Sequence, residues 1–221
     1  MIIGVVVGLA MEARAARALG GVVATGGGTA AGAETAAESL AAGGVTALLS
    51  FGLAGGLDPK LKPGELIIPR AVLSAGQNFP TDFALDRRLG GPTADLLLGE
   101  TAVVASPDAK RRLWHTTNAA AADLESGAVA QVAARHDLPF AALRAVCDPA
   151  GRSLPRTALA ALDRKGRVRV LRVLASLLLR PMDVPGLVAL AADSALARRA
   201  LAERARCIGA LGPSPVHGGP G

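Results

Sequence analysis

Two acidic side chains stand where they could take part in chemistry, each beside an apolar segment. Glu125 precedes a predicted helix over 126–136, and Asp148 follows a predicted strand over 140–146. Carboxyl groups can act as general acids, as general bases and as holders of hydroxyl groups. Each acid also has an ordinary structural explanation, because acids complement helix N-termini and Asp caps turns. The pair therefore indicates chemistry only if the fold brings both acids to one site.

Two glycine-rich segments are further candidates for ligand contact. Residues 26–28 are all Gly and precede a predicted helix over 30–40, an arrangement that presents backbone N–H groups to an anion such as phosphate. They do not complete a dinucleotide fingerprint, because the next strand ends at Phe51 without the required acid. Residues 52–56 read Gly-Leu-Ala-Gly-Gly, and such small side chains let a ligand approach the backbone. Tight turns without a ligand remain the alternative for both segments.

The elements that must position these residues alternate between strands and helices. We predict strands over 2–7, 22–25, 45–51, 66–69, 101–105, 119–122 and 140–146, and helices over 12–19, 30–40, 107–116 and 126–136. This pattern predicts an α/β fold of three layers, with helices on both faces of a central, mixed but mainly parallel twisted sheet. Such folds bind ligands at the carboxyl ends of their strands, where both acids and the glycine segments lie.

Composition narrows the class of protein. The 221 residues are enough for a single domain, which we place over 1–211, followed by a Pro/Gly-rich tail over 212–221 that we expect to be disordered. Aromatic residues make up 2%, so Ala, Val and Leu must form the core. The net charge is +6, but the basic residues are scattered and do not alternate with aromatics, so we expect no nucleic-acid partner.

The cysteines, the N-terminus and the lengths of the apolar stretches indicate the cellular compartment. The two cysteines, Cys147 and Cys207, lie far apart and form no metal-binding or disulfide pattern, so we expect no metal. The apolar N-terminus lacks a basic leader and reads as a buried strand rather than a signal peptide. No uncharged stretch has the length of a membrane span, about 20 residues. We therefore expect a cytoplasmic protein.

Two long segments carry a resemblance to a known family. SFGLAGGLDPKLKPGELIIP at 50–69 and AADLESGAVAQVAARHDLPFAALRAVCD at 121–148 occur in the order seen in the superfamily of nucleoside phosphorylases and methylthioadenosine/adenosylhomocysteine nucleosidases. The chain resembles that superfamily over about residues 1–150. The stretch DPAGRSLP at 148–155 is similar to its hopanoid-associated phosphorylase branch. This implies an enzyme that releases adenine from adenosylhopane in hopanoid biosynthesis.

The resemblance implies a role for each of six residues. Asp148 matches the acid that protonates the purine, and Glu125 matches the carboxylate that holds both ribose hydroxyls. Glu12 matches the general base that activates water in the nucleosidases, although the local alignment can shift by one residue. Leu124 would lie beside the sugar and base, and the backbones of Gly55 and Val103 would contact the base.

Departures from the family pattern leave the attacking group open. Residues 51–57 contain no Arg to hold phosphate, so the phosphorylase reading would need Arg14 or the turn at Gly28 instead. Leu53 replaces a small polar residue, and Ala102 stands where an aromatic often stacks on the base. Cys147 replaces a Ser, which is a mild change. Hydrolysis and phosphorolysis both remain open, with a slight preference for phosphorolysis from the branch; no cofactor is implied beyond phosphate as a co-substrate.

The length of the N-terminal half bears on the substrate. Only one short strand fits between the first helix and Gly26, where nucleosidases of the superfamily carry several more. A binding site that lacks these strands would be open on the 5′ side of the ribose and would admit a purine nucleoside with an apolar 5′ substituent. A helix over 167–180 carries four Arg on an apolar background; we hypothesise that it touches an anionic membrane peripherally, with packing on the sheet as the alternative. Relatives commonly form homo-oligomers, which we also expect here. The competing functions are a methylthioadenosine/adenosylhomocysteine nucleosidase and a catalytically silent nucleoside- or lipid-binding protein.

Overall fold

The structure is a computed structural model, and it describes residues 1–100, 102–154 and 184–210. The strands within these ranges join into one sheet. They are β1 (Ile3–Val7), β2 (Val22–Thr25), β3 (Ala47–Gly56), β4 (Leu66–Ile67), β5 (Pro69–Ser74), β6 (Gln77–Pro80), β7 (Ala94–Gly99), β8 (Ala121–Asp123) and β9 (Phe140–Asp148). Their order is β2-β1-β3-β8-β7-β5-β6, and β9 pairs with β3 and β4.

The sheet is mixed and mainly parallel, as the sequence predicts. β1 pairs in parallel with β2 and β3, β3 with β9, and β7 with β5 and β8. The pairs β3–β8, β4–β9 and β5–β6 are antiparallel. β3 is the central strand, because one end of it pairs with β1 and the other with β8 while β9 follows it along most of its length.

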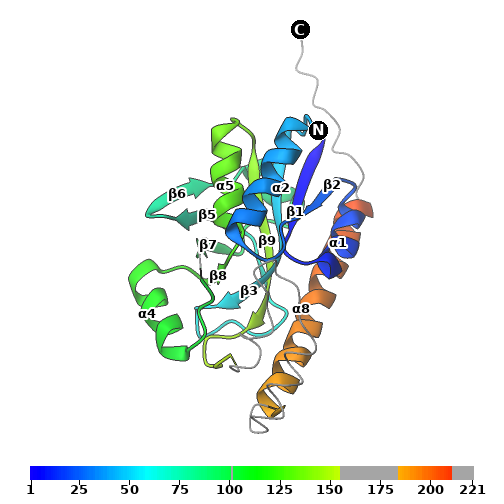
Figure 1. The fold of residues 1–221 in the computed structure, drawn as a ribbon. Helices are drawn as coiled ribbons and strands as arrows, with labels where there is room; N and C mark the ends of the chain where they lie inside the picture. Colours follow the sequence, from blue (N-terminus) through cyan, green and yellow to red (C-terminus); the bar gives the residue numbers. More distant parts are fainter. Residues whose placement is uncertain (101, 155–183, 211–221) are drawn as a thin grey trace.

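Helices cover both faces of the sheet (Figure 1). They are α1 (Ala10–Ala16), continued by a 3-10 turn at Arg17–Leu19, then α2 (Ala30–Ala42), α3 (Phe83–Leu89), α4 (Pro107–Thr117), α5 (Ser126–Arg135) and α8 (Val184–Ala210). Side chains of α2 and α5 form one apolar cluster against the sheet. Side chains of α1, α3 and α8 form a second cluster on the opposite face. The predicted three-layer α/β fold is therefore confirmed.

Local sequence explains where several helices begin. The side chains of Thr29, Asp82 and Ser106 each accept a backbone N–H from the residue three positions later. These bonds satisfy donors that the first turn of a helix leaves without a partner. Pro107 then occupies the first turn of α4, where its missing N–H costs nothing.

Two predictions between residues 70 and 105 are wrong. The stretch from residue 70 to Gly91, for which we predicted no strand or helix, contains the β5–β6 hairpin and α3. The hairpin turns at Ala75 and Gly76, which both have positive φ, and proline at positions 69 and 80 obscures its strands. The strand expected over 101–105 lies instead at 94–99 as β7, because the apolar run there pairs with both β5 and β8.

The C-terminal part is described only from residue 184, where α8 runs for 27 residues. The predicted basic helix over 167–180 and the tail over 212–221 lie outside the described residues. Among the helices that are described, none combines the length and apolarity needed to cross a bilayer.

Candidate active site

A cavity of about 240 Å³ opens where β1, β3, β8 and β9 reach their carboxyl ends. It brings together most of the residues that the sequence singles out. They are Glu12, Gly28, Gly55, Val103, Leu124, Glu125 and Asp148. Their convergence follows from the topology. The parallel strands β1, β3 and β9 deliver their carboxyl ends to this region, and β8, which is antiparallel to β3, brings Leu124 and Glu125 to it after its last residue.

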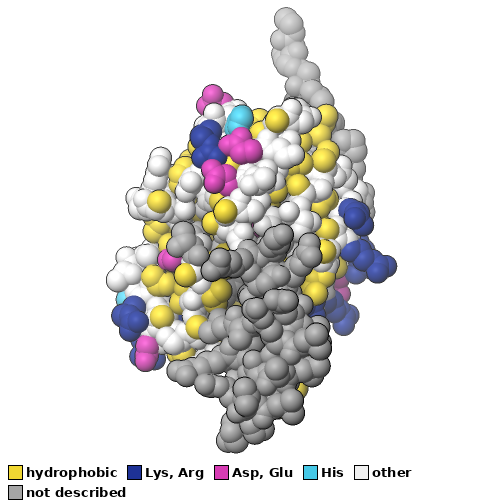
Figure 2. Space-filling model, viewed as in Figure 1, with side chains coloured by type: hydrophobic (Ala, Val, Ile, Leu, Met, Phe, Trp, Pro, Cys, Tyr) yellow, Lys and Arg dark blue, Asp and Glu magenta, His cyan; other side chains and the backbone are white. Residues whose placement is uncertain are grey.

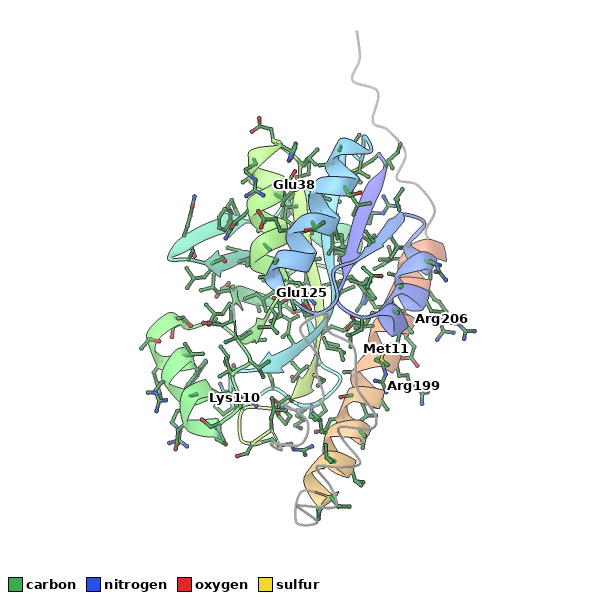
Figure 3. The ribbon with its side chains drawn as sticks, in the orientation of Figure 1. Met11, Glu38, Lys110, Glu125, Arg199 and Arg206 are labelled. Atoms are coloured by element: carbon green, nitrogen blue, oxygen red, sulfur yellow. The ribbon has the colours of Figure 1, made fainter. Side chains whose placement is uncertain are left out.

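Arg14 does not join them. It is exposed on α1 and lines a separate hollow with Arg198, Arg199 and Arg206 of α8. Figure 2 shows basic side chains gathered along this edge of the molecule, and Figure 3 labels Arg199 and Arg206 there. The cation expected to hold phosphate therefore faces away from the cavity that contains Glu125 and Asp148.

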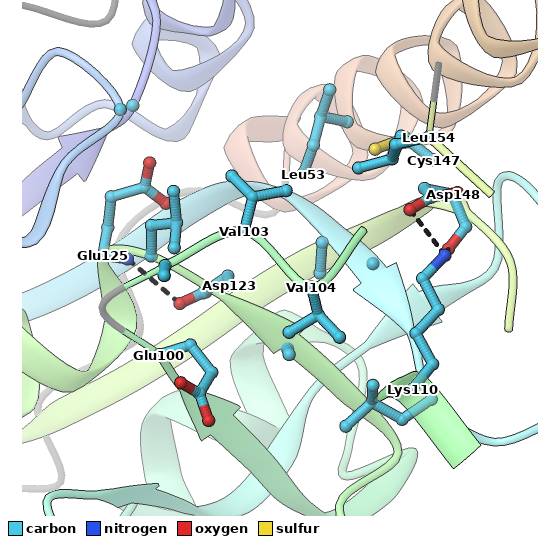
Figure 4. Close-up of a pocket in the computed structure, with 18 of the residues that line it drawn as sticks. Leu53, Glu100, Val103, Val104, Lys110, Asp123, Glu125, Cys147, Asp148 and Leu154 are labelled. Carbon is cyan, nitrogen blue, oxygen red and sulfur yellow. Dashed lines mark hydrogen bonds and ion pairs between the residues drawn. The ribbon is translucent and has the colours of Figure 1, made fainter. Parts of the chain in front are cut away.

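The cavity has two acidic ends separated by apolar side chains. In Figure 4, Glu125 and Asp123 lie at one end and Asp148 with Lys110 at the other. Leu53, Val103 and Val104 lie between them. A ligand that reached both ends would place polar groups at its extremities and an apolar or flat portion in the middle.

Arg144 of β9 organises the acids at the first end. Its Nε lies 2.5 Å from Asp123 Oδ2 and its Nη1 lies 3.0 Å from Glu125 Oε2, while Nη2 donates to Ser50 Oγ at 2.5 Å. Asp123 Oδ1 also accepts the backbone N–H groups of Glu125 and Ser126 at the start of α5. Four nearly inaccessible polar groups thus form one connected network, which holds Glu125 in a single orientation.

Glu12 lies against the same cluster. Its Oε2 accepts the backbone N–H of Leu9 at 2.8 Å, and its Oε1 accepts that of Leu53 at 3.2 Å. Burial raises the pKa of Glu12, while these backbone donors and the Arg144 charge oppose the rise. A carboxyl group with a raised pKa is suited to accept a proton near neutral pH.

Two glycines are required by the closeness of these groups. A Cβ at Gly8 would lie 2.6 Å from Glu125 Oε1 and 3.3 Å from Glu12 Oε2. A Cβ at Gly52 would lie 2.6 Å from Arg144 Nη1. The two distances of 2.6 Å are far below van der Waals contact, so a side chain at either glycine would displace Glu125 or Arg144.

Burial also dominates the ionisation of Glu125. It raises the pKa of Glu125 to about 7, with Arg144 opposing the rise and the negative charges of Asp123 and Glu12 adding to it. Asp123 and Glu125 are ion-paired with Arg144, and Glu12 also feels its charge, so the cluster holds three carboxyl groups near one guanidinium. The ionisation of Glu125 is therefore sensitive to pH in the neutral range.

Asp148, at the other end, is held by a lysine. Lys110 Nζ of α4 lies 2.6 Å from Asp148 Oδ2, and both side chains are almost fully buried. Asp148 Oδ1 has no hydrogen-bond partner among the described residues. Burial raises the pKa of the Asp148 carboxyl, while the Lys110 charge opposes the rise. The arrangement leaves one buried carboxyl oxygen beside the cavity without a hydrogen-bond partner among the described residues.

The neighbouring thiol is poorly suited to act as a nucleophile. Cys147 lines the cavity, but burial raises its pKa to about 12, and the Asp148 charge adds to the rise. A thiol with this pKa is protonated at neutral pH, and only the thiolate attacks carbon readily. The chemistry of the cavity therefore depends on its carboxyl groups.

Sequence reasoning missed Arg144 and Lys110. Arg144 did leave a signal, because a cation within the apolar run over 140–146 must be paired if that strand is buried. Lys110 left none, since a lysine on a polar helix is usually exposed. Its burial becomes visible only when α4 is placed against the loop that follows β9.

Comparison with known proteins agrees with this architecture. The 5′-methylthioadenosine/S-adenosylhomocysteine nucleosidase of Helicobacter pylori superimposes with a TM-score of 0.62 and 18% identity, over 68% of this chain and 86% of that one. Futalosine hydrolase of the same organism gives 0.61 and 18%, over 68% and 86%. A putative methylthioadenosine nucleosidase of Weissella paramesenteroides gives 0.63 and 18%, over 94% and 99%. At these identities the likeness establishes the fold.

Sequence comparison identifies the family. No curated protein matches the chain significantly. A model of the phosphorylase superfamily matches residues 20–102 and 93–180, which together cover most of the chain, including β3, the Glu125 segment and Asp148. This chain therefore belongs to the phosphorylase superfamily.

Proposed function

We propose that the chain is an enzyme that cleaves the N-glycosidic bond of a purine nucleoside, with water as the attacking group. The observation that carries the proposal is the placement of two different acidic sites at opposite ends of one cavity. Glu125 and Glu12 lie close together at one end, and Asp148 stands at the other with a free carboxyl oxygen. Breaking this bond needs chemistry at both the sugar and the base.

At the base end, Asp148 supplies a proton. When the bond between C1′ and N9 breaks, its electron pair moves into the purine, and protonation of a ring nitrogen makes the purine a better leaving group. A protonated Asp148 Oδ1 would donate to that nitrogen. Burial of the carboxyl favours its protonated form, which is the form that the step needs.

At the sugar end, Glu125 and Glu12 have separate tasks. Glu125 would accept hydrogen bonds from the ribose hydroxyls, and its charge would stabilise the cationic, oxocarbenium-like sugar of the transition state. Glu12 would accept one proton from water as the water oxygen attacks C1′. The products are the free base and the free sugar, and the proton received by Glu12 balances the one that Asp148 donates.

Water is favoured over phosphate by the charges around the cavity. Phosphate needs cationic groups or several free backbone N–H groups. The described residues that line the cavity include one basic side chain, Lys110, and its ammonium group is already ion-paired with Asp148 at the base end. Gly28 lines the cavity at the start of α2 and is the remaining candidate for phosphate contact. This distribution supports hydrolysis, against the phosphorolysis that the sequence resemblance slightly favours.

The apolar lining of the cavity supports a nucleoside that carries an apolar substituent. Leu53, Leu57, Val104, Leu154 and Leu190 contribute to this lining. Adenosylhopane, the substrate implied by the hopanoid-associated branch, fits this chemistry and is our first candidate. Methylthioadenosine is the second, because a variant of the similar Helicobacter pylori nucleosidase holds it in its active site.

Product analysis tests the proposal. The protein is incubated separately with adenosylhopane, methylthioadenosine and adenosine, with and without phosphate, and free adenine and the sugar product are quantified. Hydrolysis yields a free sugar at a rate that phosphate does not change, whereas a sugar 1-phosphate would contradict it. Asp148→Asn should slow release by about 10²–10⁴-fold, the range for a general acid. Absence of adenine from all three substrates would refute the proposed function.

A further inference from the structure

Lys110 occupies an unusual position for a lysine. Its side chain is 1% exposed, and its Nζ lies within hydrogen-bond distance of four oxygen atoms. These are the Asp148 carboxylate at 2.6 Å, the Asp148 carbonyl at 3.4 Å, and the carbonyls of Pro149 and Arg152, both at 3.0 Å. Two of these oxygens belong to Asp148, the last residue of β9, and two to the turn that follows, so one ammonium group joins α4 to the end of β9 and to that turn.

This position is costly for a cation. Lys110 lies near the start of α4, which begins at Pro107, and positive charge is unfavourable near the N-terminus of a helix. Transfer of an ammonium group from water into the interior is also unfavourable unless it is paired. A neutral side chain would join the same elements without either penalty. The ion pair with Asp148 compensates for the cost, so the charge of Lys110 acts chiefly on that carboxyl group.

We propose that Lys110 is a positioning residue for the reaction, which holds Oδ2 of Asp148 so that Oδ1 is the oxygen presented to the base. The inference rests on the proposed function of Asp148 as the proton donor. Oδ1 is buried and without a partner among the described residues, and Asp148 lines the cavity. Because a carboxyl group can rotate about its Cβ–Cγ bond, an anchor on one oxygen determines where the other one points.

The same contact adjusts when Asp148 is protonated. Three charged groups on different elements face it: Lys110 on α4 and Arg152 in the following turn favour its charged form, and Asp193 on α8 disfavours it. Arg152 is itself ion-paired with Asp193, which reduces the effect of both on Asp148. Loss of the Lys110 charge should therefore favour protonation of Asp148 and move the alkaline limit of activity to higher pH.

Two substitutions separate the effect of the hydrogen bond that orients Asp148 from the effect of the charge. Lys110→Met removes both the hydrogen bond and the charge, whereas Lys110→Gln removes the charge and keeps an N–H donor. We expect Lys110→Met to lower kcat by about 100-fold with little change in KM, because a donor displaced by about 1 Å loses that much. Lys110→Gln should lose less. In both variants the pH at which kcat falls on the alkaline side should increase by about one unit or more.

The control is Arg112→Met, which removes a cation from an exposed position of the same helix. It should leave kcat and the pH profile unchanged. If Lys110 were only a structural link, kcat of its variants would fall in parallel with their melting temperatures while the alkaline limb stayed in place. That result would overturn the inference.

A carboxyl titration keeps this test separate from the proposed function. ¹³C NMR of protein labelled at the Asp carboxyls follows the Asp148 signal, which is assigned by its absence in Asp148→Asn. Asp148 should titrate at higher pH in Lys110→Met than in the unsubstituted protein, and equal titration would overturn the inference. If the unsubstituted protein releases no base from any nucleoside, the proposed function fails, and this titration alone still decides whether Lys110 controls the ionisation of Asp148.

Discussion

Replacing Glu125 by Gln should make the protein more stable above neutral pH while removing its activity. Glu125 is 7% exposed, and its carboxylate shares Arg144 with Asp123. Burial raises its pKa from 4.5 to about 7. At pH 8 the folded protein must therefore hold an anion in a place that disfavours the charge. Gln has the shape of a protonated Glu and retains an oxygen that can accept from Arg144.

The magnitude follows from the linkage between ionisation and folding. A carboxyl whose pKa is raised in the folded state binds its proton more tightly there than in the unfolded chain. Its contribution to stability is complete below pH 4.5 and is lost as the pH rises through about 7. At about 1.4 kcal/mol per pH unit, this interval corresponds to about 3 kcal/mol. Glu125→Gln should match the unsubstituted protein near pH 4.5 and exceed its unfolding free energy by up to about 3 kcal/mol at pH 8.

Urea denaturation at a series of pH values between 4.5 and 8 measures this difference. Glu65→Gln, at an exposed glutamate in the loop before β4, controls for the loss of a carboxyl group as such. Its difference from the unsubstituted protein should be small and independent of pH. If Glu125→Gln were equally destabilising at both ends of the range, the reasoning would be wrong, because the carboxylate would then stabilise the fold through its bond to Arg144.

Three further experiments, two with substitutions and one with a thiol reagent, test other parts of the site. Gly8→Ala should sharply reduce kcat/KM, because its Cβ would lie 2.6 Å from Glu125 Oε1; unchanged kinetics with methylthioadenosine would contradict that geometry. Arg144→Met should lower the free energy of unfolding by about 3–5 kcal/mol, since it leaves buried carboxylates without their cation; an unchanged urea midpoint would show that the network is not strongly coupled to folding. Iodoacetamide at pH 8 should modify exposed Cys207 and spare Cys147, because burial raises the pKa of Cys147 to about 12. Peptide mass spectrometry measures the labelling, and equal modification of the two cysteines would contradict this expectation.

Much of the architecture can be predicted from the sequence because it depends on local patterns. The β-branched run in β1 reads as a buried strand, and Thr29 and Pro107 mark helix starts that the structure retains. The order of the glycine segment and the two acids predicts that Glu125 and Asp148 stand at strand ends on one edge. The hairpin at 69–80 escapes this reasoning, because its prolines obscure the strand pattern.

The electrostatic environment of the acids is decided by tertiary structure. Arg144 reaches Glu125 across 19 positions of sequence, and Lys110 reaches Asp148 across 38. Neither pairing follows from helical or strand periodicity, since each joins different elements. Arg14 illustrates the reverse case: it is near Glu12 in sequence, yet the helix turns it to the exposed face. The sequence determines which residue types stand at the strand ends. Burial and pairing in the folded chain decide how readily each carboxyl gains or loses its proton, because both depend on which charges the fold brings within a few ångströms.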